Sequence, residues 1–152
     1  MANVSYKKPP ALMLKVGNPI IEFLLGRGWG PTSELMVLRW RGKKSGAEYS
    51  TPVSRFEIDD RLMTFTNSGW RHNFVGGHPV DVTLDKQVIA MKGTVVDDPS
   101  TVGAAQSRVI EEWGDKAKRA MALRWETTPT LDEMVEFTTA NGTVMVEFER
   151  TG

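Results

Sequence analysis

Two short segments combine residue types that could hold an anionic, planar small molecule. The first, residues 41–46, reads Arg-Gly-Lys-Lys-Ser-Gly, so three cations share a turn with two glycines that let a ligand approach the backbone closely. Lysine and arginine donors suit phosphate or carboxylate oxygens. The alternative is a solvated lysine-rich hairpin tip that discourages edge pairing. The candidate binding residues here are Arg41, Lys43, Lys44 and Ser45.

The second segment, residues 67–73, reads Asn-Ser-Gly-Trp-Arg-His-Asn and follows an apolar stretch. It predicts a tight turn that opens one helical turn, where exposed backbone N–H groups favour anions. A tryptophan offers a flat surface, and arginine and asparagine offer donors. The alternative is that the tryptophan is a core aromatic at a barrel end and the last asparagine caps a turn. The candidate residues are Asn67, Ser68, Gly69, Trp70, Arg71 and Asn73.

Other kinds of reaction centre find little support in the sequence. The chain has no cysteine, which excludes disulfides, thiolate nucleophiles and cysteine-ligated metals. His72 and His78 have no carboxylate at ligand spacing beside them, so a metal centre is not expected. Ser45 and Ser68 lack the nucleophile-elbow pattern. A hydrolytic triad is therefore not expected either.

The charge distribution points to a small anionic partner. Among 152 residues, 19 Lys and Arg balance 19 Asp and Glu. Residues 1–56, however, hold nine basic and three acidic residues, while each of the remaining thirds has an acidic excess of three. We interpret this uneven distribution as a sign that the first third of the chain builds most of an anion-binding site. Nucleic acid is not expected as a partner, because few stacking aromatics adjoin the basic turn.

The N-terminal part predicts one short helix. Asn18 followed by Pro19 is a helix start, and an apolar helix is expected over 19–25. It would pack on a sheet, cover a ligand or rest on a membrane surface as a peripheral contact. No secretory signal is apparent in residues 1–10, so a cytoplasmic location is expected. The apolar stretch 11–25 is interrupted by charges and is too short to span a bilayer.

The rest of the chain predicts strands first, helices later and one returning strand. Turn residues separate the strand-like segments, and helical spacing with capping residues marks the helices. This order is typical of an α+β protein with a mainly antiparallel sheet closed into a small barrel, and we expect residues 1–152 to form a single domain. The expected strands are 34–40, 48–58, 62–66, 80–84, 88–96 and 144–148, and the expected helices are 98–114, 116–125 and 130–141.

Residues 35–96 resemble the deazaflavin-dependent nitroreductase family. The resemblance rests on the cationic turn, then Thr51-Pro52, then Trp-x-x-Asn at Trp70 and Asn73, then His-Pro-Val at residues 78–80. Members are split antiparallel β-barrels, similar to FMN-binding and pyridoxamine-phosphate-oxidase-like barrels. The resemblance therefore implies this barrel, with an N-terminal helix and C-terminal helices added to it.

The resemblance also implies an oxidoreductase. Such an enzyme uses a reduced deazaflavin, coenzyme F420, to transfer hydride to an electron-poor acceptor such as a quinone, enone or nitro compound. The acidic cofactor tail would lie near the cationic turn and near Thr51 and Pro52. The ring would lie near residues 67–69, with Ser68 and Trp70 at the reacting face. Related barrels also suggest a homodimer.

One departure from the family keeps other cofactors open. Many members carry a longer loop with Lys-Gly-Gly before the tryptophan, whereas here Gly69 is followed directly by Trp70. Either Arg71 replaces the missing lysine or the cofactor differs. FMN is the alternative cofactor, and a small-ligand-binding barrel without catalysis is the third interpretation.

Overall fold

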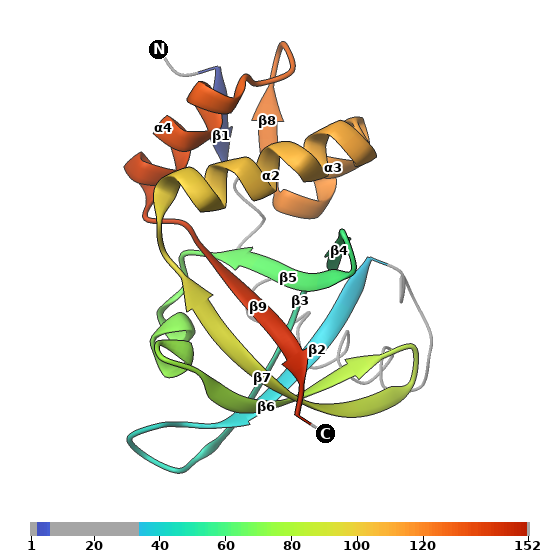
Figure 1. Ribbon diagram of the computed structural model, residues 1–152, viewed down its shortest axis with the longest axis vertical. Helices are drawn as coiled ribbons and strands as arrows, with labels where there is room; N and C mark the ends of the chain where they lie inside the picture. The colour runs from blue at the N-terminus through green and yellow to red at the C-terminus, as the bar shows by residue number, and fades with distance from the viewer. Residues whose placement is uncertain (1–2, 7–33, 152) are drawn as a thin grey trace, which may run out of the picture.

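The computed structural model describes residues 3–6 and 34–151, which form two layers. An antiparallel sheet curled into a split barrel makes the lower layer in Figure 1, and helices with a small second sheet lie above it. This confirms the predicted α+β class and the split barrel. The helix expected over 19–25 lies outside the described residues.

The barrel is closed through the chain itself. Its seven strands run in the order β3-β2-β6-β7-β9-β5-β4, with every pair antiparallel. The two edge strands, β3 and β4, are consecutive in sequence and are joined by Arg55. The strand expected over 48–58 is therefore one segment that changes partner at Arg55, from β2 to β5. The strands are β2 (Leu35–Arg41), β3 (Glu48–Ser54), β4 (Phe56–Ile58), β5 (Arg61–Thr66), β6 (His78–Leu84), β7 (Gln87–Val96) and β9 (Val144–Arg150).

Arg55 holds this change of partner in place. Its backbone N–H donates to the Glu34 carbonyl at 2.8 Å. Its guanidinium pairs with Glu57 of β4 at 2.8 Å and with Asp85 of the β6–β7 turn at 3.1 Å. The Arg55 side chain thus ties strand β4 to the β6–β7 turn.

The barrel interior is filled by alternating apolar side chains. Because strand residues point to opposite faces in turn, every second residue of β2, β6 and β9 enters the barrel. Gly93 of β7 leaves room for Phe74, which is fully buried against the sheet. The buried members of this core are Met36, Leu38, Trp40, Phe74, Val80, Val82, Met91, Val146 and Phe148.

The helical layer covers the outer face of β4, β5 and β9 through a second core. Its helices are α2 (Pro99–Trp113), α3 (Asp115–Met121) and α4 (Leu131–Asn141). Both predicted helix starts are confirmed: Asp98 accepts from Thr101 N at 3.0 Å, and Thr130 forms a capping box with Glu133. No helix in the described part of the chain is both long enough and apolar enough to cross a bilayer.

The helix predicted over 116–125 ends early. Helix α3 stops at Met121, because Ala122 adopts a left-handed conformation with φ +54°. Leu123 and Trp125 are then buried while Arg124 is exposed, which is strand periodicity. This strand, β8 (Leu123–Trp125), pairs with β1 (Val4–Tyr6) near the other end of the chain. A partner so distant in sequence could not be read from the local pattern.

Tyr6 fastens β1 to the helical layer. Its hydroxyl lies 2.6 Å from Thr143 Oγ1, and its ring centroid lies 4.8 Å from that of Phe137. Burial raises the pKa of the Tyr6 phenol, and the hydrogen bond to Thr143 opposes this rise. Tyr6→Phe should lower the free energy of unfolding by about 1 kcal/mol, because the buried Thr143 hydroxyl loses its partner.

The same variant has an expected pH dependence. A phenol whose pKa is raised on folding stabilises the protein fully below its unfolded pKa of about 10, and this contribution is lost as pH rises through the folded value. The stability difference between Tyr6→Phe and the parent should therefore shrink above about pH 10. Urea denaturation at neutral and alkaline pH measures it. A difference that does not change with pH would contradict this account.

Candidate functional site

The two segments singled out in the sequence meet in one groove. The β2–β3 hairpin projects beside the short 3-10 helix η2 (Gly69–Phe74) in Figure 1. Between them lies a groove of about 610 Å³, within the range of small-molecule sites. Its lining residues are Trp40, Gly42, Lys43, Lys44, Ser45, Tyr49, Trp70, His72 and Asn73.

Asn73 joins the two segments directly. Its side-chain oxygen accepts a hydrogen bond from Lys43 N at 2.9 Å, and its side-chain amide donates to the Trp70 carbonyl at 3.0 Å. Lys43 Nζ adds a second link by donating to the Val75 carbonyl at 2.7 Å. The cationic turn is therefore held against η2 rather than projecting freely into solvent.

The turn itself depends on Gly42. Gly42 N donates to the Ala47 carbonyl at 2.8 Å, and Gly46 N donates to the Gly42 carbonyl at 2.9 Å. A Cβ atom at Gly42 would lie 2.8 Å from both Ser45 Oγ and a ring carbon of Tyr49. A side chain there would displace both groove residues, which explains the need for glycine.

Aromatic rings form one wall of the groove. Trp40 and Tyr49 are cross-strand partners in β2 and β3, and their rings stack with centroids 6.0 Å apart at 24°. The Trp70 ring lies 5.6 Å from that of Trp40, and the buried Phe74 lies beneath both. Such a surface favours stacking of a planar ring.

The charges of the groove are all of one sign. Lys43 and Lys44 are exposed, and none of the described residues that line the groove is acidic. The Lys43 ammonium already uses one of its three N–H donors in the hydrogen bond to the Val75 carbonyl. Within the described part of the chain, Lys44 has neither a hydrogen bond nor an ion pair, so its ammonium can turn toward a ligand. A cationic rim beside an aromatic wall suits a planar molecule with an anionic tail.

Several predicted binding residues lie outside the groove lining. Arg41 points to a neighbouring cleft and donates to the Gly46 carbonyl at 3.4 Å, and Thr51 and Pro52 lie on the edge strand β3. Arg71 donates to the carbonyls of Asn67 and Ser68 at 3.0 and 2.9 Å, so it braces the loop before η2. Asn67, Ser68 and Gly69 also lie outside the lining. Ligand contacts by all of these residues stay predictions.

The sequence reasoning missed three lining residues. Trp40 ends the expected strand 34–40, Tyr49 lies within the expected strand 48–58, and His72 is considered only as a metal ligand. The hairpin register was the available signal, because strands joined by a short turn place Trp40 opposite Tyr49. His72 had no local signal beyond its position beside Asn73.

Asn73→Leu should loosen the groove while keeping the side chain's size. Both hydrogen bonds of Asn73 would be lost, which we expect to lower the free energy of unfolding by about 1–2 kcal/mol. Amide hydrogen exchange at Lys43 should accelerate, because its N–H loses its acceptor. Gln87→Leu, on an exposed position of β7, is the matched control. Unchanged exchange at Lys43 would show that Asn73 does not hold the turn.

Comparison with known proteins supports the fold. No family model matches this chain, and neither does any curated protein sequence. A conserved hypothetical protein from Mycobacterium tuberculosis has a similar structure, with 15% identity and a TM-score of 0.52 over 88% of this chain and 80% of that one.

Two further solved structures are less similar. An FAD and heme binding protein from Mycobacterium smegmatis gives 14% identity and a TM-score of 0.45 over 99% of this chain and 69% of that one. An F420 reductase gives 14% identity and a TM-score of 0.43 over 86% of this chain and 93% of that one. The sheet topology and the groove of the described residues define an α+β split-barrel protein with a cationic, aromatic groove.

Proposed function

We propose that this protein is an oxidoreductase that binds a reduced deazaflavin of the F420 type in the groove and delivers hydride to an electron-poor acceptor. The observation that carries the proposal is the hydrogen bond from Lys43 N to the Asn73 side chain, which joins the cationic turn to the Trp-x-x-Asn segment. These are the two motifs on which the resemblance to the deazaflavin-dependent nitroreductases rests.

The groove residues fit such a cofactor in chemical type. Lys43, Lys44 and Ser45 supply cations and a hydroxyl for a phosphodiester and a carboxylate tail. The stacked Trp40 and Tyr49 rings supply a flat wall for a planar ring. A tail with several negative charges suits two lysines better than a single phosphate does, which favours the deazaflavin over FMN.

When bound, the deazaflavin supplies the hydride, so the chain need only bind, orient and exclude water. Trp70, half-buried and on the groove wall, shields one side of the ligand site. Ser68 is exposed just before Trp70, and its hydroxyl is our candidate donor to an acceptor oxygen. Its N–H is already held by Thr66 Oγ1 at 3.0 Å, which fixes the backbone there.

A fluorescence titration of the purified full-length protein with coenzyme F420 tests the proposal. Binding at micromolar concentrations is expected, followed by oxidation of the reduced cofactor when a quinone, enone or nitro compound is added. A flat titration would remove the deazaflavin proposal. Binding without turnover of any acceptor class would instead favour the non-catalytic small-ligand barrel.

FMN is the second candidate, because the chain lacks the family's Lys-Gly-Gly loop before Trp70. Protein purified from a flavin-rich host should then be yellow and retain FMN on gel filtration. Colourless protein that does not bind added FMN would reject this candidate. The sequence also leads us to expect a homodimer and a single domain. Light scattering on the same sample would test the homodimer, and limited proteolysis would test the single domain.

A further inference from the structure

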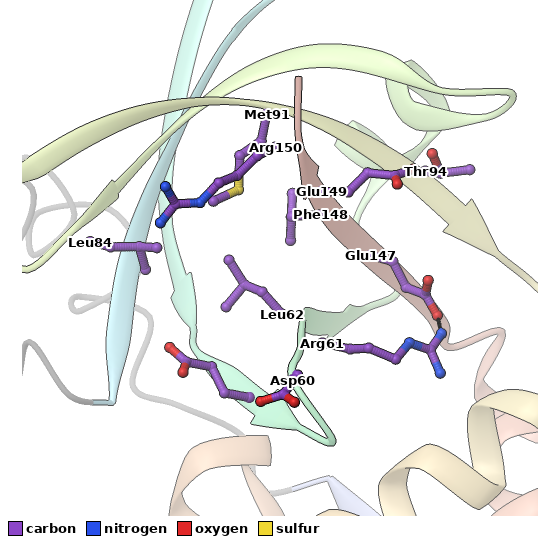
Figure 2. Close-up of a pocket in the computed structure, with 11 residues that line it drawn as sticks. Asp60, Arg61, Leu62, Leu84, Met91, Thr94, Glu147, Phe148, Glu149 and Arg150 are labelled. Carbon is purple, nitrogen blue, oxygen red and sulfur yellow. Dashed lines mark ion pairs between the residues drawn. The ribbon is translucent and has the colours of Figure 1, made fainter. Parts of the chain in front are cut away.

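A second pocket, of about 570 Å³, opens beside the β4–β5 turn and shares no lining residue with the groove (Figure 2). The proposed function makes no use of it. Its size also falls in the range of small-molecule sites.

The floor of this pocket is apolar. Leu62 and Gly93 are both cross-strand partners of Phe148, and Met91 is the partner of Arg150. Phe148 and Arg150 are two residues apart on β9, so both side chains lie on the face that enters the barrel. Leu62, Leu84, Met91 and Phe148 all belong to or pack on the barrel core. The pocket thus opens directly onto the barrel's apolar interior.

Most charges around the pocket are already paired or lie on the other face of β9. Glu57 is held by Arg55 at 2.8 Å, and Glu147 forms an ion pair with Arg61. Figure 2 shows Glu147 and Glu149 on the opposite side of β9 from the Arg150 guanidinium. That placement agrees with the alternation along the strand.

Arg150 is the charge on the inner face that has no partner within the described residues. Its guanidinium extends toward the space beside Leu84 in Figure 2. The backbone is fixed there, because Arg150 pairs with Met91 and the next residue, Thr151, donates to the Ala90 carbonyl at 3.4 Å. The backbone of Arg150 is therefore fixed beside the apolar floor, and its guanidinium can reach a ligand that rests there.

We propose that this pocket binds an apolar monocarboxylate, with the carboxylate on Arg150 and the apolar body on Leu62, Leu84, Met91 and Phe148. The planar fork of arginine binds a carboxylate through two parallel hydrogen bonds. Asp60 also lines the pocket, on the β4–β5 turn, and repels a second negative charge. The site therefore selects a single carboxylate at one end of an apolar molecule.

Methyl NMR on the full-length protein with labelled methionine and leucine tests this proposal, with sodium octanoate as the probe. Saturable shifts are expected at Met91, Leu62 and Leu84. Octylamine and the dicarboxylate suberate should bind about tenfold more weakly or worse, since each lacks the charge pattern of the site. The NMR sample contains no deazaflavin, so the result does not depend on whether the proposed function is correct.

Arg150→Gln should weaken octanoate binding by about tenfold or more. Arg124→Gln, an equal change on the exposed face of β8, should leave it unchanged. Arg150 is exposed, so its variant should fold, and the methyl spectrum reports this directly. If Arg150→Gln unfolds, the affinities of the parent protein for octanoate, octylamine and suberate test the proposal instead.

Three results would overturn the proposal. One is octylamine or suberate binding as well as octanoate does. Another is undiminished octanoate binding by a folded Arg150→Gln variant. The third is a set of contacts to the same methyl groups, without octanoate, from residues 7–33 or from a second copy of the chain, which would assign the pocket to protein instead.

Discussion

The double variant Lys43→Glu, Lys44→Glu should bind deazaflavin roughly a hundredfold more weakly than the parent protein. Each lysine offers a charge-assisted hydrogen bond worth about tenfold in affinity, and among the described residues no other lysine or arginine lines the groove. Reversal of both charges also replaces attraction of the anionic tail by repulsion. Fluorescence titration measures the change.

The matched control for this variant is Lys86→Glu with Arg124→Glu. It shifts net charge by the same amount at exposed positions outside the groove lining. The affinity of the parent should fall as salt rises, because added ions screen exposed charges, whereas the groove variant should respond less. Lys44→Glu alone separates the effect of charge on affinity from an effect on folding, because the hydrogen bond to the Val75 carbonyl comes from Lys43 and stays intact. Equal affinities of groove and control variants would show that the turn is a solvated hairpin tip.

Gly93→Val should lower the free energy of unfolding by about 2–3 kcal/mol, because the valine would overpack the barrel core. A Cβ atom at this position would lie 2.8 Å from one ring carbon of Phe74 and 3.2 Å from one of Phe148. Both rings are buried, so neither can move into solvent. Phe74 packs against Trp40 and Trp70, so its displacement should also disturb the groove wall.

The control for this prediction is Ala90→Val, an exposed position on the same strand. It should change stability by less than about 0.5 kcal/mol. Urea denaturation gives the stability of both variants, and cofactor titration shows whether the groove is affected. A Gly93→Val protein that is as stable as the control would mean that Phe74 can repack without loss.

The sequence predicted most elements because their signals are local. Asp98 and Thr130 bind backbone N–H groups only three residues away, so these caps mark helix starts without reference to the rest of the fold. The turn at Asp85 and Lys86 is likewise local: two polar residues separate two strand-like segments, and both adopt the positive φ of a two-residue hairpin turn. Hairpin partners therefore followed from chain order.

Long-range pairings were not predictable in this way. The alternation of Leu123 and Trp125 spans one turn and fits a helix end as well as a strand, and only pairing with Val4–Tyr6 settles it. The ion pair that Arg55 forms at the change of partner similarly involves Asp85, 30 residues further along the chain. Such contacts join residues far apart in sequence, whose approach is fixed by the packing of both cores.

By itself the sequence determined the chemistry available: a cationic turn, a Trp-x-x-Asn segment and no cysteine. It also determined the α+β order of elements, because side-chain periodicity follows directly from backbone geometry. Only the tertiary structure decided that Asn73 joins the two segments and that Trp40 and Tyr49 form the wall. It also decided that Arg150, which has no partner among the described residues, lies beside an apolar floor. Proximity between distant residues is set by which strands pair and how the barrel closes, and no local pattern encodes that.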